Sequence, residues 1–249
     1  MATSMNQRTV QQLYDELSVA LSDGDTDAAL EQLDVICRVH SDHGGAWELR
    51  GLLQAQSGRP NLAVRYFERA RELVSLEVWS SRIMAMQYLA IGREKTAVGL
   101  LYTLGVSAPL ATAMTRLISH DLLTLGHPEL SASVIRSALQ RNRREPLLWH
   151  ELSAIESRLG ESPAVCLQSV ENAILLAPEV AEFRVTAATL LIQMDLPSEA
   201  YEVVCQVVSG QSIELDCECC LWRLVCIFDC FDDHDRMAVC YQRLRGIQR

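Results

Sequence analysis

The chain has 249 residues, of which 49% are hydrophobic and 6% aromatic, and its formal net charge at pH 7 is −10. This apolar fraction is too high for a disordered polymer, and the acidic balance argues against a long nucleic-acid-binding surface. The first eight residues are polar and lack the apolar core of a secretory signal, so we expect a cytoplasmic protein.

The longest uncharged run, residues 97–115, raises the question of a membrane span. Gly99, Gly105 and Pro109 interrupt this run, and Arg116 follows it directly. Because a span needs a continuous apolar stretch, we expect a turn inside the run and no association with a membrane.

Five glycines recur along the chain with a constant spacing of 34 residues. Repetition at a fixed period is typical of repeat architectures, in which each unit is one small supersecondary element. The glycines are Gly24, Gly58, Gly92, Gly126 and Gly160, and the residues five positions later are Ala29, Ala63, Ala97, Ser131 and Val165.

The prolines agree with this period. Pro60, Pro128 and Pro197 follow the turn position by two residues, and Pro146 opens a new unit. Because proline fixes φ and lacks an N–H, it is favoured in the first turn of a helix and excluded from the interior. We therefore predict that none of the seven prolines lies inside a helix.

Between these positions the apolar residues have helical spacing, as at Leu13 and Leu17 and at Ala63, Phe67 and Ala70. Each unit is predicted to be a helix, a tight turn at the glycine, a second helix and a second turn. One such pair cannot bury its apolar face alone, so we expect the pairs to stack into a solenoid.

The pattern resembles the tetratricopeptide repeat (TPR) family, whose repeat reads W-x2-L-G-x2-Y, then A-x3-F, then A and P. The unit that begins at residue 44 fits best, although Arg50 and Gln54 replace the leucine and tyrosine of the pattern. Its matching residues are Trp47, Gly51, Gly58, Ala63, Phe67 and Ala70.

The resemblance implies an all-α, right-handed superhelical solenoid of about seven TPR-like helix pairs. It covers a single domain, residues 10–249, after a flexible segment at residues 1–9. The sixth unit has Asp195 at the glycine position, and the seventh has Trp222 and Ala238 sixteen residues apart. The predicted units are residues 10–43, 44–77, 78–111, 112–145, 146–180, 181–218 and 219–249.

The resemblance also implies that the first helix of each pair lines a concave groove that binds a peptide or protein. Positions 2, 5, 6, 9, 12 and 13 of each unit face that groove in the family. The apolar members could instead pack between units, whereas arginine among apolar residues is typical of an interface hot spot. The candidate groove residues are Leu49, Leu52, Trp79, Arg82, Ile83, Met86, Arg116, Leu117, His120, His150 and Arg158.

Arg82 and Arg116 occupy the same repeat position, 34 residues apart, so we expect their guanidinium groups in neighbouring rows with Trp79 at one edge. This arrangement suits an acidic or carboxylate-ended peptide that carries an apolar anchor. The competing interpretation is that both arginines pair with acidic side chains on adjacent helices.

Charged residues are unevenly distributed along the chain. Arginines gather at residues 136–144, and acidic residues crowd residues 214–235. Either set can be a solvated face. The functional alternative is head-to-tail self-association or electrostatic steering of a partner.

Seven of the nine cysteines lie between residues 205 and 240. Cys217 and Cys220 form a C-x-x-C pair, and Cys230 and His234 follow further along, so these four residues are candidate ligands of a tetrahedral zinc site. The other interpretation is that the cysteines are small buried residues, and without a secretion signal no disulfide framework is expected.

No catalytic motif is present: the chain has no phosphate-binding glycine loop, no H-E-x-x-H and no G-x-S-x-G. We therefore predict a scaffold or adaptor that is not an enzyme, needs no cofactor and binds protein or peptide in its groove. The alternative is a metal- or thiol-responsive regulatory module that uses the C-terminal cysteines.

Overall fold

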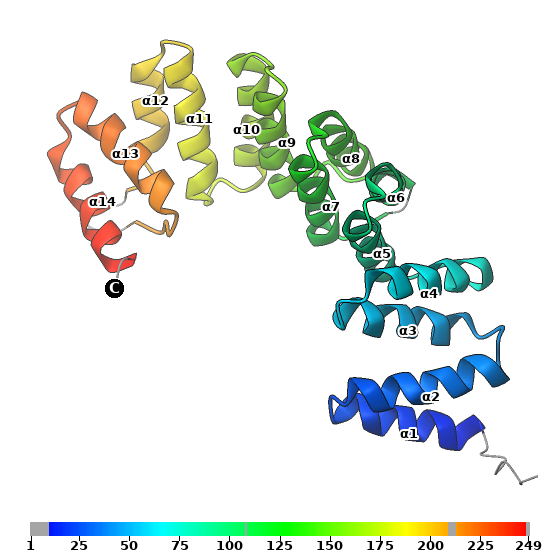
Figure 1. The fold of residues 1–249 in the computed structure, drawn as a ribbon. Helices are drawn as coiled ribbons and strands as arrows, with labels where there is room; N and C mark the ends of the chain where they lie inside the picture. Colours follow the sequence, from blue (N-terminus) through cyan, green and yellow to red (C-terminus); the bar gives the residue numbers. More distant parts are fainter. Residues whose placement is uncertain (1–9, 108, 209–212, 248–249) are drawn as a thin grey trace, which may run out of the picture. The chain divides into compact units, whose positions relative to one another are not determined.

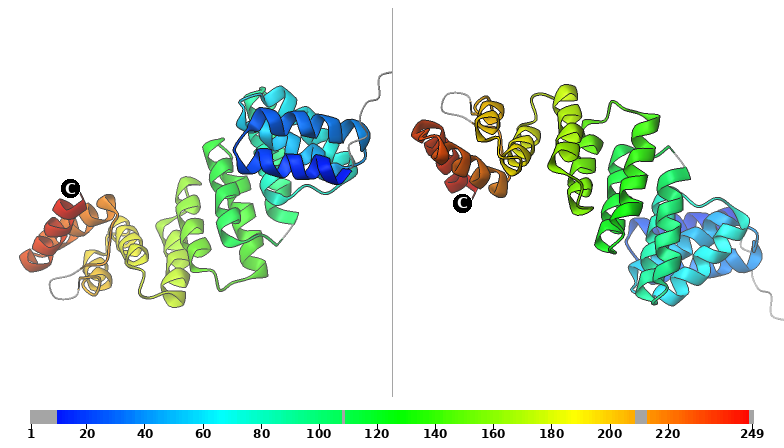
Figure 2. Two further views of the ribbon diagram at one scale, coloured as in Figure 1. Left: turned by 90° about the horizontal axis from the view of Figure 1, so that it is seen from below. Right: turned by 90° about the horizontal axis from the view of Figure 1, so that it is seen from above.

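The computed structural model describes residues 10–107, 109–208 and 213–247, and the predicted flexible segment 1–9 lies outside them. Within those ranges the chain forms fourteen helices and no strand, arranged as consecutive pairs whose second helix runs back beside the first (Figures 1 and 2). The predicted all-α solenoid of helix pairs is confirmed. The helices are α1 (Val10–Ser22), α2 (Thr26–Val39), α3 (Gly44–Gln56), α4 (Pro60–Leu73), α5 (Val78–Ala90), α6 (Glu94–Ser107), α7 (Thr112–Thr124), α8 (Pro128–Arg141), α9 (Pro146–Arg158), α10 (Pro163–Leu176), α11 (Ala181–Gln193), α12 (Pro197–Val204), α13 (Glu218–Cys230) and α14 (His234–Ile247).

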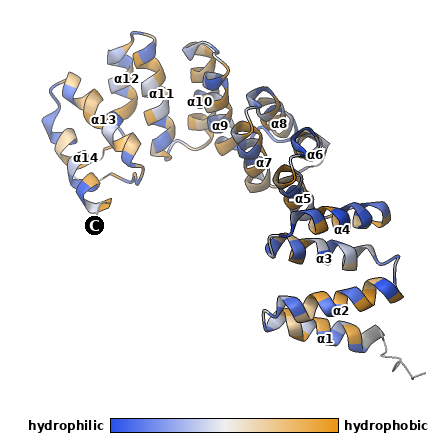
Figure 3. Cartoon of the chain, viewed as in Figure 1, coloured by the Kyte–Doolittle hydropathy of each residue, from blue (hydrophilic) through white to orange (hydrophobic). Residues whose placement is uncertain are grey.

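The chain divides after Leu104, near the end of α6, into two compact units. In the first unit, Leu13, Leu33 and Ile36 belong to a buried cluster that joins α1, α2 and α3. The second unit has successive buried clusters at α8–α9, at α10–α11 and from α11 to α14. Within each unit, helix pairs thus bury apolar faces between their own two helices and against a neighbouring pair, and Figure 3 shows apolar and polar residues alternating along single helices.

The periodic glycines end the first helix of each of the first five pairs. All five have positive φ, between +69° and +79°. After α7, for example, the N–H of Gly126 donates to the carbonyl of Leu123 and the N–H of His127 to that of Leu122, at 3.1 and 2.9 Å. This is the Schellman arrangement, which needs a left-handed residue and therefore favours glycine.

Aspartate takes the left-handed position in the last two pairs. Asp195 follows α11 with φ +62°, and Asp232 follows α13 with φ +53°. The bond that closes the turn is retained, because the N–H of Leu196 donates to the carbonyl of Leu191 at 3.0 Å. Aspartate tolerates this conformation better than most residues that have a Cβ atom.

No proline lies inside a described helix, as predicted. Five prolines begin a helix, and Pro109 and Pro178 lie between helices. The uncharged run at residues 97–115 is interrupted as expected, because α6 ends at Ser107 and α7 begins at Thr112. Every helix in the described ranges falls short of the length and apolar content that a membrane span requires.

Small residues allow the two helices of a pair to approach closely. Ala29, Ala63, Ala97 and Ser131 are fully buried. In the fifth unit the buried residue is Cys166, one position after the exposed Val165, because the inner turn there has one extra residue.

In the last pair the predicted register is wrong. Ala238 is exposed, and Cys240 is the small residue that is fully buried on α14. The physical reason is that Trp222 lies one residue closer to its turn. The left-handed Asp232 comes ten positions after Trp222, whereas Gly58 comes eleven positions after Trp47. Counted from the turn, the position of the small residue falls on Met237, which packs against the core. Ala238 comes one residue later, so its side chain points about 100° away from that of Met237.

Arg50 departs from the repeat pattern, which has leucine at its position, and its charge is compensated locally. Its Nη2 lies 2.6 Å from the Oδ1 of Asp34, and its guanidinium carbon lies 4.2 Å from the centre of the Tyr66 ring. A half-buried arginine that gains an ion pair and a cation–π contact can replace an apolar residue between two helix pairs.

Candidate functional site

A groove of about 640 Å³ runs between α7 and α9, the first helices of two successive pairs in the second compact unit. Its lining side chains recur at intervals of three and four residues on each helix, so each set projects from one face. The groove is lined by Ala113, Arg116, Leu117, His120, Leu123, Leu147, His150, Glu151 and Ala154.

Four of the predicted site residues meet in this groove: Arg116, Leu117, His120 and His150. Leu147 and the two alanines are not among the residues predicted from the sequence. A signal for them was present, because Leu147 stands at position 2 of its unit, and Ala113 and Ala154 stand at positions 2 and 9 of theirs.

Arg116 is paired across the groove. Its Nε donates to the Oε2 of Glu151 at 2.8 Å, and the side chains of Arg116 and Glu151 are 48% and 16% exposed. The competing interpretation, that the arginine pairs with an acidic side chain on an adjacent helix, therefore holds for Arg116. The pair is half open to solvent, so its net contribution to stability is about 1 kcal/mol or less.

His150 is held at the base of the groove. Its Nε2 lies 2.9 Å from the Oγ1 of Thr186, and its ring centre lies 4.8 Å from that of Phe183, both on α11. Burial lowers the pKa of His150 below its ordinary value of 6.5, against the opposing effect of Glu182. His150 is therefore a neutral, positioned side chain near pH 7.

The remaining predicted groove residues lie elsewhere. Arg158 is exposed at the end of α9 and is absent from the lining of the groove. Leu49 packs against the buried cluster of α1 to α3, as the packing interpretation expected, and Leu52 is half-buried on the same helix.

A second candidate surface lies on α5, in the first compact unit. Trp79 is 50% exposed, and the guanidinium carbon of Arg82 lies 5.5 Å from the centre of its ring. Ile83 and Met86 are half-buried and share the face by their helical spacing. An exposed tryptophan with an arginine over its face and apolar neighbours has the composition of an interface hot spot.

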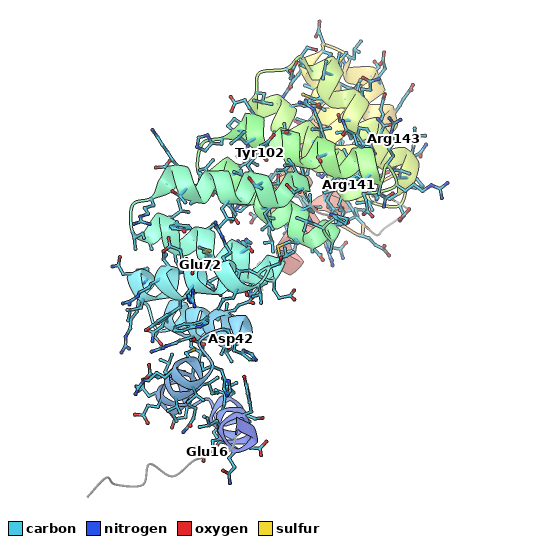
Figure 4. The ribbon with its side chains drawn as sticks, turned by 90° about the vertical axis from the view of Figure 1, so that its right-hand side faces the viewer. Glu16, Asp42, Glu72, Tyr102, Arg141 and Arg143 are labelled. Atoms are coloured by element: carbon cyan, nitrogen blue, oxygen red, sulfur yellow. The ribbon has the colours of Figure 1, made fainter. Side chains whose placement is uncertain are left out.

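The basic cluster at residues 136–144 is partly occupied by internal contacts. Arg136 pairs with the buried Glu156 at 3.1 Å. Arg141, at the end of α8, donates to the carbonyl oxygens of residues 106 and 105 at 2.9 and 3.3 Å. Figure 4 labels Arg141 together with Arg143 from the turn after α8. Head-to-tail self-association through this cluster stays a prediction.

The predicted four-ligand zinc site is wrong in its membership. The structure gathers the sulfur atoms of Cys217, Cys219 and Cys220 within 4.8 Å of one another at the start of α13. Cys230 and His234 lie at the other end of that helix and at the start of α14. A helix of thirteen residues is about 20 Å long, so neither can join the cluster.

The three thiols of this cluster differ in their surroundings. Hydrogen bonds from the Cys219 thiol and from the amides of the first helical turn lower the pKa of Cys217, whereas burial raises that of Cys220. The general expectation that cysteines are buried holds for four of the nine, since Cys37, Cys166, Cys220 and Cys240 are buried.

Comparison with known proteins reveals similarity of structure only. No family model and no curated protein matches the chain. The C-terminal part of a TPR repeat-containing protein from Cytophaga hutchinsonii superposes with a TM-score of 0.62 at 10% identity, covering 94% of this chain and 95% of that one. A tetratricopeptide repeat protein from Parabacteroides merdae gives 0.54 at 14% identity, covering 96% and 93%.

A third similar structure is YrrB, described as a TPR protein with an unusual peptide-binding site. It superposes with a TM-score of 0.52 at 13% identity and covers 86% of this chain and 100% of that one. Together with the helix pairs, the left-handed turn residues and the buried small residues, these similarities show that the chain has the tetratricopeptide-repeat fold.

Proposed function

We propose that the chain is a non-catalytic scaffold that binds a protein or peptide segment in the α7–α9 groove. The observation that carries the proposal is the composition of this groove. It presents two exposed apolar side chains, Leu117 at 39% and Leu147 at 42%, beside the Arg116–Glu151 pair. Arginine is enriched among the residues that contribute most to affinity at protein interfaces, and apolar side chains around it exclude water when a partner binds.

The chemistry of the groove favours a segment with a carboxylate and an apolar side chain. Only the Nε of Arg116 is used in its bond to Glu151, and a guanidinium has five N–H donors. A carboxylate on the partner would bind the outer donors or displace Glu151, while its apolar side chain covers the two leucines.

The α5 surface is a second contact in this proposal. Trp79 and Arg82 would bind a separate region of a protein partner. The similar protein YrrB is described as having a peptide-binding site, which is consistent with a ligand of the same class.

The absence of catalysis is part of the proposal and rests on the lining of the groove. His150 is the buried base there, and no serine, cysteine or threonine is among the described residues that line the groove with it. The hydroxyl that His150 contacts, Oγ1 of Thr186, donates its hydrogen to the carbonyl of Glu182 and therefore accepts from Nε2 of His150. This is not the geometry in which a base activates a nucleophile.

Two variants with opposite expected effects test the ligand class. Binding of synthetic peptides to the chain is measured by fluorescence anisotropy. Each peptide has one apolar side chain and a free carboxyl terminus, and it is compared with a copy whose carboxyl terminus is amidated. Arg116→Ala should lower the affinity for the free-acid peptide that binds most tightly in this screen by about 30- to 1,000-fold, that is by about 2–4 kcal/mol. Glu151→Gln should strengthen its binding, because the carboxylate that competes for Arg116 is removed.

Arg158→Ala is the matched control, since it removes an exposed arginine from the end of α9, outside the groove. If Arg116→Ala lowers stability but keeps the affinity of the wild-type chain, Arg116 serves only its pair with Glu151 and the groove assignment is refuted. Adding Arg82→Ala to Arg116→Ala then measures the contribution of the α5 surface, with helicity followed by circular dichroism.

A further inference from the structure

Three cysteine sulfurs converge at the N-terminus of α13, in the second compact unit and on helices other than those of the groove. The Sγ atoms of Cys217, Cys219 and Cys220 all lie within 4.8 Å of one another, and those of Cys217 and Cys219 are 2.9 Å apart. Nothing in the scaffold function proposed above makes use of this cluster.

The fold positions these sulfurs through the geometry of the helix start. Cys217 is the N-cap residue of α13, with extended backbone angles of −77° and 110°, and Cys219 and Cys220 belong to the first turn. An N-cap side chain naturally faces the third residue of its helix, as in a capping box. The amides of Cys220 and Leu221 donate to the carbonyl of Cys217 at 3.1 and 3.0 Å, which fixes that first turn.

The segment that precedes Cys217 is anchored rather than loose. Ile213 and Leu215 are buried in the same cluster as Cys220, so both sides of the thiol group are tied to one core. The guanidinium of Arg243 on α14 donates to the carbonyl of Leu215 and pairs with Asp216. The three sulfurs are therefore arranged before any ligand arrives, which reduces the ordering cost of binding.

We propose that Cys217, Cys219 and Cys220 bind one soft, thiophilic metal ion through their three sulfur atoms. Thiolate ligands select soft ions such as Cu(I) and Zn(II) over hard ions such as Mg(II). Metal–sulfur bonds of about 2.3 Å place ligand sulfurs about 3.8–4.0 Å apart, within the span of this cluster. Only the closest pair of sulfurs has to separate, and Cys219 is exposed and can turn.

Three features set the character of this site. The positive end of the α13 dipole lies beside the sulfurs and favours anionic thiolate ligands there, against the opposing effect of burial at Cys220. Asp216 and Glu218 lie exposed on either side of Cys217 in the sequence, so carboxylates are close to an incoming cation even though Asp216 pairs with Arg243. The described residues contribute three sulfur ligands and no fourth, so one side of a bound ion stays open to exchange, unlike a closed structural zinc site.

The test must separate this cluster from other reactive thiols. In the full chain, the accessible cysteines outside the cluster (Cys205, Cys226 and Cys230) are replaced by serine to give a reference protein. Cys217→Ser and Cys219→Ser are then added to the reference. Cys220 is left in place because it is 8% exposed and belongs to the core, so the fold is kept.

Both proteins are titrated without oxygen with Cu(I), Zn(II) and Mg(II), each against a coloured chelator, and the thiolate-to-metal absorption is recorded. The reference protein should bind one soft ion per chain, Cu(I) more tightly than Zn(II), and Mg(II) should not compete. The cluster variant should lose about 100-fold or more in affinity for the soft ions, with unchanged circular dichroism.

Equal affinity of the two proteins for Cu(I) and for Zn(II) would overturn the proposal, and so would the loss of all soft-ion binding on going from the natural chain to the reference protein. Neither result depends on the groove, since no residue of the cluster lies in its lining.

Discussion

Two glycines in the first compact unit, seven residues apart, should respond to the same substitution with opposite signs. Gly92 ends α5 with φ +76°, whereas Gly99 lies inside the helix α6. A Cβ atom built at either position would meet no atom within 4 Å. Any difference between Gly92→Ala and Gly99→Ala therefore comes from the backbone and from the unfolded chain, not from packing.

The expected magnitudes follow from the φ angle. An alanine at Gly92 would adopt a left-handed conformation, which lowers the free energy of unfolding by about 1–2 kcal/mol. The same substitution reduces the entropy of the unfolded chain, which raises the free energy of unfolding by about 0.4–1 kcal/mol. Gly92→Ala should thus destabilise by about 1 kcal/mol, and the β-branched Gly92→Val by about 1–3 kcal/mol. Gly99→Ala should stabilise by about 0.5–1 kcal/mol, because it only removes the helix-breaking freedom of glycine.

Urea unfolding followed by far-ultraviolet circular dichroism measures these differences as shifts in the transition midpoint at constant slope. Both residues lie in the same compact unit, so their effects are read from the same transition. Equal shifts for the two alanine variants, or stabilisation by Gly92→Ala, would refute the assignment of Gly92 to a left-handed turn and with it the repeat period.

The remaining predictions also concern stability. Gly51→Ala should cost about 1–3 kcal/mol in urea unfolding, because its Cβ atom would lie 2.8 Å from the Phe67 ring and force α3 and α4 apart. Arg136→Ala should cost about 1–3 kcal/mol in the same assay, since it removes the charged partner of Glu156, which is 5% exposed. Because the pKa of His150 is lower in the folded chain than its ordinary value of 6.5, the neutral side chain contributes stability above pH 6.5 that is lost as the pH falls through the folded-state pKa. Glutamine does not titrate, so the melting temperature of His150→Gln should fall less than that of the natural chain when the pH is lowered from above 6.5.

Turn positions and helix boundaries could be predicted from the sequence because each depends on one residue with an unusual preference for a backbone conformation. A glycine at positive φ and a proline in a first helical turn mark their positions almost without regard to the neighbours. Asp195 shows the same logic, since one residue at the expected place in the period was enough to identify its turn.

Pairings between helices could not be predicted in the same way. The helical spacing placed Arg116 on the groove face, but whether it meets a ligand or Glu151 depends on the distance and rotation between α7 and α9. These quantities are set by many packed side chains at once. An acidic partner for Arg116 was one of two interpretations of the sequence. The structure shows that partner, Glu151, and the effect of Arg116→Ala on peptide affinity decides whether Arg116 also binds a ligand.

The cysteine cluster shows a different failure. The C-x-x-C pattern selected Cys217 and Cys220 and omitted Cys219, and the two further ligands were taken from later in the chain, at Cys230 and His234. An N-cap side chain, however, faces the first turn of its own helix, where Cys219 and Cys220 lie. The wrong prediction for Ala238 has a similar cause. It counted sixteen residues from Trp222, but this tryptophan lies one residue closer to its turn than in the other units, and Ala238 is exposed.

Site-specific photo-crosslinking tests the central claim, that the α7–α9 groove is where a protein segment binds. A photoreactive amino acid is placed singly at Leu117, at Leu147 and at Val165 on α10, which are 39%, 42% and 40% exposed. Because the exposure is matched, the yield reports on location and not on accessibility. With the selected free-acid peptide bound, we expect crosslinks at Leu117 and Leu147 and background yield at Val165. Equal yields at all three positions, or none at the two leucines while the peptide still binds, would contradict the account.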